Sequence, residues 1–178
     1  MIKKTLPYMT NDEIVDLVSY LTRDTEMLEI GGGNSTIFLS KLVKRLVTIE
    51  HNFEWSKTIE NMMKNSDVDW TLHVVEPNWS QIHPFQPAES GQFDNYVNFI
   101  STLDDNQFDV ILVDGRDRVR CTLQSIPKLK KNGIMLIHDF WNREKYHVLL
   151  DNNELDLIVD SNSYNKTTNN TLVALKKK

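Results

Sequence analysis

A short apolar segment that runs into consecutive glycines most constrains what this chain can fold into. Residues 27–33 read MLEIGGG, and a second apolar run over residues 46–49 ends on Glu50. Because glycine lacks a Cβ and tolerates positive φ, such a turn lets the backbone approach another group closely. A strand, a glycine turn, a helix and a second strand predict a βαβ unit, whose ligands bind at the carboxyl ends of the strands.

Apolar runs alternate with helical patterns along the rest of the chain, which predicts an α/β fold. Runs such as VILV at residues 110–113 are apolar on both faces, as expected for strands buried between two helix layers. We therefore expect a doubly wound, seven-stranded, mostly parallel sheet, with a hairpin across the short link 161–170. The strands are expected over residues 27–30, 45–50, 70–76, 108–114, 133–138, 155–160 and 171–176.

Helix-end signals accompany the helical patterns. Thr10 and Glu13 fit a capping box, and the cations before Asn132 and Gly133 are typical of a helix end. Helices are expected over residues 10–22, 35–44, 53–64, 92–103, 118–130 and 143–150.

Length and composition limit the classes of protein that this sequence fits. With 178 residues and a hydrophobic fraction of 40%, we expect one soluble domain over residues 1–178, with residues 1–24 as an N-terminal helix appended to the core. A net charge of −5 argues against nucleic-acid binding, and no apolar run approaches the roughly 18 residues of a membrane span. The single cysteine, Cys121, excludes an internal disulfide and a cysteine-based metal site. A cytoplasmic protein with a small-molecule partner is expected, and a homo-oligomer stays open.

The spacing of the glycines distinguishes between cofactors. Thr36 stands where the dinucleotide fingerprint G-x-G-x-x-G has its third glycine, which disfavours a nicotinamide or flavin dinucleotide. Glu29 before the glycines and Glu50 after the next strand instead resemble motif I and the acidic loop of class I S-adenosylmethionine (SAM) dependent methyltransferases. The resemblance covers residues 25–175 and implies the Rossmann-like methyltransferase fold, with an antiparallel last strand and SAM as the cofactor.

The resemblance also implies roles for individual residues. In that family the glycine turn holds the methionine part of SAM, and the later acid holds the ribose. On this chain Glu29, Gly31 and Gly33 would then line the methionine end, and Glu50 would hold the ribose. The alternative is an ordinary βαβ turn without a ligand. The full set implied for the cofactor is Glu29, Gly31, Gly33, Asn34, Ser35, Glu50 and His51.

Two later strands also end on acids. FDVILVDG at residues 108–115 ends on Asp114, and GIMLIHD at residues 133–139 ends on His138 and Asp139. Adjacent parallel strands deliver these side chains to one edge, so Asp114, His138 and Asp139 are the candidate catalytic residues, with His138 or Asp139 as the general base. The alternatives are a hydrogen-bonded structural role for His138 and a helix cap for Asp139.

An acid pair at these strand ends also resembles the Mg²⁺-dependent catechol O-methyltransferase type. There, the two acids and an Asn directly after the second hold the metal, which would lower the pKa of acceptor hydroxyls. In this chain Phe140 follows Asp139, and Asn142 stands at a different offset. This departure disfavours a Mg²⁺ site but leaves Asp114 and Asp139 as its candidates.

Arginines just past the strand ends point to the charge of the acceptor. Arg116 and Arg143 follow Asp114 and Asp139, and guanidinium groups bind carboxylates or phosphates in bidentate fashion. We expect them, with Tyr146, to bind a sugar acid, a phosphorylated metabolite or a carboxylate. The alternative is that these arginines pair with surface acids.

The long segment 76–92, with three prolines, predicts an ordered loop at the ligand edge, either a lid or a packed crossover. The sequence contains no Asn/Asp-Pro-Pro-Tyr/Phe, G-x-S-x-G or P-loop motif. O-methylation of a small molecule is therefore the favoured function. The rivals are an NAD(P)-dependent oxidoreductase and a non-catalytic relative that binds a nucleotide or a partner.

Overall fold

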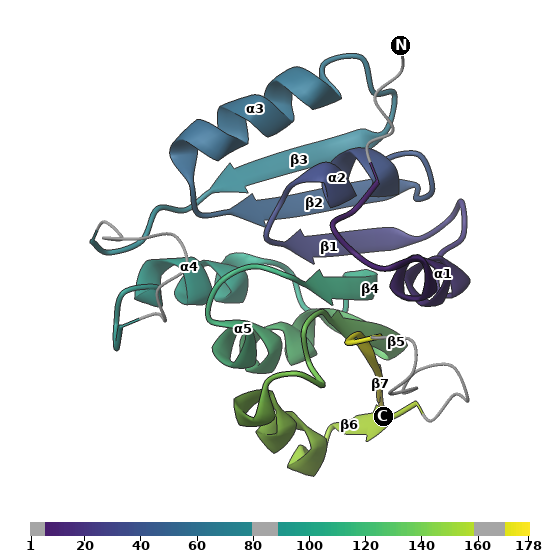
Figure 1. Cartoon of the computed structure of the whole chain (residues 1–178), viewed down its shortest axis with the longest axis vertical. Coiled ribbons are helices and arrows are strands. Elements are labelled where there is room, and N and C mark those ends of the chain that lie inside the picture. Colours follow the sequence, from purple (N-terminus) through teal and green to yellow (C-terminus); the bar gives the residue numbers. More distant parts are fainter. Residues whose placement is uncertain (1–5, 80–88, 159–169) are drawn as a thin grey trace.

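The computed structural model, which describes residues 6–79, 89–158 and 170–178, contains one seven-stranded sheet (Figure 1). The strand order is β3-β2-β1-β4-β5-β7-β6, and of these seven strands β7 runs in the direction opposite to the other six. This confirms the expected mixed sheet with an antiparallel last strand; the link 161–169 lies outside the described residues. The strands are β1 (Glu26–Ile30), β2 (Arg45–Glu50), β3 (Asp69–Val74), β4 (Phe108–Val113), β5 (Leu129–Ile137), β6 (Leu155–Leu157) and β7 (Val173–Lys177).

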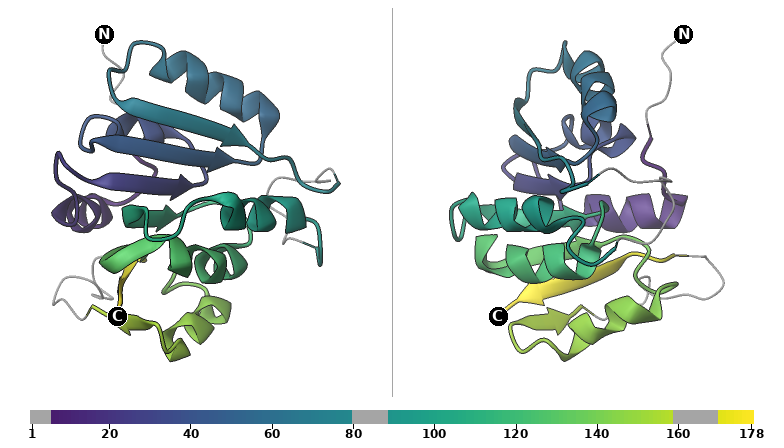
Figure 2. Two further views of the ribbon diagram at one scale, coloured as in Figure 1. Left: turned by 180° about the vertical axis from the view of Figure 1, so that it is seen from behind. Right: turned by 90° about the vertical axis from the view of Figure 1, so that its left-hand side faces the viewer.

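Helices cover both faces of the sheet, with α4 and α5 on one side and α1 and α2 on the other (Figure 2). Helices and strands alternate along most of the chain, as a doubly wound fold requires. The α-helices are α1 (Asn11–Ser19), α2 (Asn34–Leu39), α3 (Phe53–Met63), α4 (Asp94–Phe99) and α5 (Arg118–Ser125), and the 3₁₀ helices are η1 (Ile100–Thr102), η2 (Ile126–Lys128) and η3 (Glu144–Asp151).

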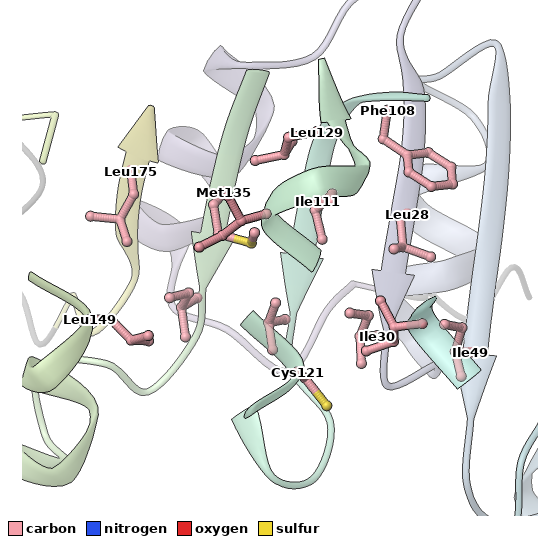
Figure 3. Packing of buried hydrophobic residues seen from close by; sticks show 14 of the residues in the cluster. Leu28, Ile30, Ile49, Phe108, Ile111, Cys121, Leu129, Met135, Leu149 and Leu175 are labelled. Carbon is pink, nitrogen blue, oxygen red and sulfur yellow. The ribbon is translucent and has the colours of Figure 1, made fainter. Parts of the chain in front are cut away.

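Alternate residues of each central strand enter two separate cores. Leu28 and Ile30 of β1 face α4 and α5 together with Ile111 and the buried Cys121 (Figure 3). Met27 of β1 faces the opposite core. Burial on both faces explains why these strands are apolar throughout.

The N-terminal helix begins at the predicted capping box. The Glu13 carboxylate accepts the Thr10 N–H at 2.8 Å, and the Thr10 hydroxyl accepts the Glu13 N–H at 3.3 Å. Leu17 of α1 is fully buried in the same core as Met27. Helix α1 is therefore packed on the sheet.

The end of the helix predicted over 118–130 is wrong. Helix α5 ends at Ser125, and β5 already begins at Leu129, which pairs with Phe108 of β4. Lys130 forms ion pairs with Glu26 and Asp109 across the sheet. Cations that resemble a helix end locally are thus held in a strand by partners that are distant in sequence.

The order of the strands places a switch point between β1 and β4. From β1 the chain continues outward through β2 and β3, and from β4 it continues in the opposite direction through β5. Loops that leave the carboxyl ends of β1 and β4 separate there and create a crevice. Over the described ranges, no helix has both the length and the apolar character needed to cross a bilayer.

Candidate active site

A cavity of about 940 Å³ opens at the carboxyl ends of β1, β2, β4 and β5. It lies at the switch point, where ligands bind in open α/β sheets. Of the residues singled out from the sequence, Glu29 and His138 are not on its wall. Those that do line it are Gly31, Gly33, Asn34, Ser35, Glu50, His51, Asp114, Arg116, Asp139, Arg143 and Tyr146.

Gly31 allows the loops after β1 and β4 to touch. Its φ is +98°, and a Cβ there would lie 2.5 Å from the Cα of Gly115. A side chain at Gly115 would in turn collide with the Tyr96 hydroxyl. Both glycines are therefore required by the close approach of the two backbones, which forms the floor of the cavity.

Glu29 lies beneath the glycine turn and is fully buried. Its carboxylate accepts hydrogen bonds from the hydroxyls of Ser35 (2.5 Å), Thr36 (2.6 Å) and Thr48 (3.1 Å). Burial raises its pKa to about 7, although these hydrogen bonds act in the opposite direction. Thr36 thus replaces the third glycine of a dinucleotide fingerprint with a donor that ties α2 to β1.

Glu50 reaches the cavity from the end of β2. Its Oε2 accepts the N–H of Gly32 at 3.0 Å, and its Oε1 accepts the N–H of Asn52 at 2.7 Å. His51 Nδ1 lies 2.9 Å from Glu50 Oε1, and its ring packs edge-on against Phe93. The carboxylate is therefore fixed relative to the glycine turn before any ligand arrives.

His138 is clamped between two acids. Its Nδ1 lies 2.9 Å from Asp114 Oδ1, and its Nε2 lies 3.6 Å from Glu13 Oε2 on helix α1. Burial alone would lower the pKa of His138, but the hydrogen bonds with Asp114 and Glu13 outweigh it and raise the pKa to about 9. His138 is therefore an imidazolium at neutral pH, which favours its structural role over that of a general base.

Arg118, at the start of α5, joins the strand-end acids Asp114 and Asp139. Its guanidinium lies 3.0 Å from Asp114 Oδ1 and 3.1 Å from Asp139 Oδ2. It also donates to the backbone oxygens of Gly115 and His138. The Arg118 side chain is 11% exposed, so this bridge is largely shielded from water.

Asp139 pairs with cations and does not cap a helix. The backbone of Asp139 has a φ of 58°, and Arg143 Nη2 lies 3.1 Å from Asp139 Oδ2. Burial opposes ionisation, but the charges of Arg118, His138 and Arg143 lower the pKa of Asp139. The cap position before η3 is Arg143.

These acids do not fit a divalent metal. One oxygen of Asp114 and one of Asp139 contact the Arg118 guanidinium, and a metal between the carboxylates would have to displace that cation. In the described part of the chain, no three or more His, Cys, Asp or Glu side chains gather as a metal-binding group. The donor set therefore disagrees with the Mg²⁺ type.

The wall beyond Asp139 carries cations and an aromatic ring. The guanidinium of Arg143 and the ammonium of Lys145 lie 5.9 Å and 5.7 Å from the ring centre of the buried Tyr146. The guanidinium of Arg116 lies 5.3 Å from the ring centre of Phe93. Burial, together with the charges of Arg118 and Arg143, lowers the pKa of Arg116. This wall is thus locally positive in an acidic protein.

Several cavity residues were missed from the sequence. Trp55 donates its indole N–H to the Gly32 oxygen at 2.9 Å, and Tyr8, which is 98% exposed, also lines the cavity. Glu13 was recognised only as a helix cap, yet it also accepts the N–H and the hydroxyl of Thr171 at 2.6 Å. A local signal exists for Arg118, which follows the strand-end acid Asp114 by four residues.

A protein-family model described as a methyltransferase domain matches residues 28–140 of this chain. A search of curated proteins finds no match. Among solved structures, a methyltransferase-like protein from Silicibacter pomeroyi shares 18% identity with a TM-score of 0.70, over 99% of this chain and 88% of its own.

Two further solved structures resemble the fold at lower identity. A methyltransferase from Geobacter sulfurreducens has a TM-score of 0.64 at 12% identity, over 95% of this chain and 80% of its own. An O-methyltransferase from Bacillus cereus, in complex with S-adenosylhomocysteine (SAH), has a TM-score of 0.62 at 14% identity, over 100% of this chain and 83% of its own. The family match includes both glycine loops and the two strand-end acids of the cavity, and the chain belongs to the class I SAM-dependent methyltransferases.

Proposed function

We propose that this protein transfers the methyl group of SAM to an oxygen atom of a small, anionic acceptor. The observation that carries this proposal is the division of the cavity at the strand ends into two chemically different walls. One wall presents the glycine turn and Glu50, and the other presents arginines. The O-methyltransferase from Bacillus cereus, which has the same fold, supports oxygen as the acceptor atom.

SAM fits the cofactor wall, which is formed by the ends of β1 and β2. Gly31 and Gly33 would lie along its methionine part, with Asn34 and Ser35 at the start of α2 beside it. Glu50, already held by the N–H groups of Gly32 and Asn52, would accept the ribose hydroxyls.

The other two residues expected at the cofactor, His51 and Glu29, lie at the edge of this wall and beneath it. His51 would lie at the adenine side, against Phe93. Because Glu29 is fully buried below the turn, its role would be to position Ser35 and Thr36 rather than to contact SAM. SAM supplies a methyl group on a positively charged sulfur, and the residues described here orient it.

The acceptor fits the acceptor wall, which is formed by the ends of β4 and β5. Arg116, Arg143 and Tyr146 would contact it, since guanidinium groups pair with carboxylates and phosphates in defined geometry. Cations outnumber carboxylates on this wall. The acids are Asp114, Asp117 and Asp139, and the cations are Arg116, Arg118, Arg120, Arg143 and Lys145.

Thermal unfolding with added ligands tests the cofactor. A ligand present at 100 times its dissociation constant adds about 2.7 kcal/mol to the free energy of unfolding, which raises the Tm by several degrees. We expect SAM and SAH to stabilise the protein and NAD to have no effect. Stabilisation by NAD alone would favour the oxidoreductase, and no response to any of the three would favour a non-catalytic relative.

A further inference from the structure

The acids at the acceptor wall are all engaged by cations within the protein. Asp114 Oδ1 contacts both the His138 imidazole and the Arg118 guanidinium, at 2.9 Å and 3.0 Å. Asp139 Oδ2 contacts Arg118 and Arg143, each at 3.1 Å. A carboxylate that accepted a proton from an acceptor would have to give up these ion pairs, so neither acid is suited to general-base catalysis.

The other titratable groups of the cavity are either paired or exposed to solvent. Asp117 pairs with Arg120 at 3.0 Å, and Glu50 and His51 face each other on the cofactor wall. Tyr8, Glu89 and Lys145 line the cavity and are exposed to solvent, so water competes for their polar atoms. The described acceptor wall therefore offers no group poised to remove a proton from an alcohol or a phenol.

A metal ion, the other usual means of activating a hydroxyl, is also opposed by the geometry. The guanidinium of Arg118 lies between Asp114 and Asp139, where a shared divalent cation would have to lie. It is held there by hydrogen bonds to backbone oxygens as well, at 3.1 Å for Gly115. Arg118 is therefore a permanent cation of this wall, not a side chain that waits for a ligand.

These contacts point to the chemical group of the acceptor that reacts. The inference rests on the proposed function. We propose that the acceptor reacts through a carboxylate, which enters already ionised and becomes a methyl ester without a metal ion or a general base. A carboxylate oxygen forms the new bond to the methyl carbon while the carbon–sulfur bond breaks and the sulfur keeps its electron pair. No proton is transferred, and the charges of the sulfonium and the carboxylate cancel.

Three cations close to Asp114 and Asp139 match this substrate. Arg116 and Arg143 flank the acids on the cavity wall, and Lys145 follows on η3. A second anionic group on the same acceptor would contact them while the reacting carboxylate faces SAM. The acceptor is thus a small acid with at least one further acidic group.

Methyl transfer from tritium-labelled SAM into a bacterial small-molecule extract tests this inference. The extract, freed of macromolecules, is divided by anion exchange into an acidic and a neutral fraction and incubated with the intact protein and EDTA. We expect label only from the acidic fraction, in a product that releases volatile methanol in mild alkali, as esters do and ethers do not. Amidation of the extract with carbodiimide and methylamine beforehand should abolish the label.

Two outcomes overturn the inference while leaving the proposed function intact, namely an alkali-stable product from the acidic fraction and a dependence on added Mg²⁺. Binding of SAM with transfer only to the neutral fraction overturns both the inference and the anionic acceptor. If SAM does not bind, the proposed function itself fails, so the two failures are distinguishable. A rise of kcat/KM with unit slope between about pH 6 and 8 would also contradict a reaction without a general base.

A charge-removing variant tests the acceptor wall directly. For Arg143→Gln we expect kcat/KM for the acidic fraction to fall about ten- to a hundred-fold, mainly through KM, as for a lost hydrogen bond to a charged group. SAM binding should not change. Arg23→Gln is the matched control, because Arg23 is exposed and is not on the cavity wall. Equal activity of the two variants would remove Arg143 from the acceptor site.

Discussion

The two walls of the cavity satisfy their strand-end acids in opposite ways. On the cofactor side, Glu50 on the wall and Glu29 buried beneath it are held by neutral donors, namely hydroxyls and backbone N–H groups. On the acceptor wall, Asp114 and Asp139 are held by guanidinium and imidazolium cations. Neutral donors leave the charge of an acid available to a cationic ligand such as SAM, whereas cations cancel it and make the wall attractive to anions.

The largest effect is expected where a cation is removed from the acceptor wall. Arg118→Ala removes the partner that Asp114 and Asp139 share and leaves them with His138 and Arg143 alone, which should cost about 3 kcal/mol of the free energy of unfolding, the lower end for a broken buried pair. Urea unfolding measures this loss. Arg120→Ala is the control, since Arg120 pairs with Asp94 and Asp117 but is 44% exposed, and such surface pairs contribute about 0–1 kcal/mol. Equal losses in the two variants would show that Arg118 is an ordinary surface cation.

The protonated His138 gives the acceptor wall a specific pH dependence. Its pKa is raised from 6.5 to about 9 in the folded state, so its stabilisation is complete below pH 6.5 and is lost as the pH rises through 9. The loss should amount to about 3 kcal/mol at most. Urea unfolding between these pH values should show this decline in the wild type and a flat profile in His138→Gln. If the wild type and His138→Gln lose stability in parallel, His138 is not the group that titrates in this range.

Glu29 gives the cofactor wall a pH dependence in a lower window. Its pKa is raised from 4.5 to about 7, so the unfolded chain loses this proton first and stability falls as the pH rises from 4.5 to 7. The fall should be about 3 kcal/mol at most and should be absent from Glu29→Gln. Thermal unfolding across this window compares the two proteins. A variant that unfolds in parallel with the wild type would show that Glu29 is not buried with a raised pKa.

The charge of Glu50 should matter for SAM more than for the fold. Glu50→Gln keeps an oxygen for the N–H of Gly32 or Asn52 but lacks the charge, and SAM binding should weaken by about 1.5–3 kcal/mol. Isothermal titration calorimetry measures the change. Glu54→Gln, on the exposed face of α3 and paired only with Lys57, is the control and should bind SAM as the wild type does. Unchanged binding in Glu50→Gln would mean that the proposed cofactor position is wrong.

The smallest effect is expected for a single neutral donor. Thr36→Val keeps the volume of the side chain but removes the hydroxyl that donates to Glu29 and accepts the N–H of Gly33. We expect a loss of about 1–3 kcal/mol in the free energy of unfolding, measured in urea at a pH above the Glu29 pKa. Ser101→Ala, which removes an exposed hydroxyl bonded to Asn98, is the control. A Thr36→Val variant as stable as this control would show that Ser35 and Thr48 satisfy Glu29 alone.

The contrast between the walls also explains what could be predicted. The glycine turn, Glu29 and Glu50 lie within one βαβ unit, so their spacing predicted the fold and placed Glu50 at the edge of the cavity. The partners on the acceptor wall are distant in sequence: Glu13 contacts His138 just after β5 and Thr171 before β7, and Arg118 reaches Asp139. No local pattern shows that such groups meet, so the sequence left both a base and a structural role open for His138, and its pairing with Asp114 and Glu13 favours the structural role.

The sequence by itself determined the α/β fold, the mixed sheet, the glycine turn and the residues of the cavity edge, because local patterns and short spacings carry these features. Only the tertiary structure decided the charge state of that edge. Burial and long-range pairing set the pKa of Glu29 and His138, and they place Arg118 between Asp114 and Asp139. Strand ends are predictable from hydrophobic patterns, whereas electrostatics depend on every charge that folding brings within a few ångströms.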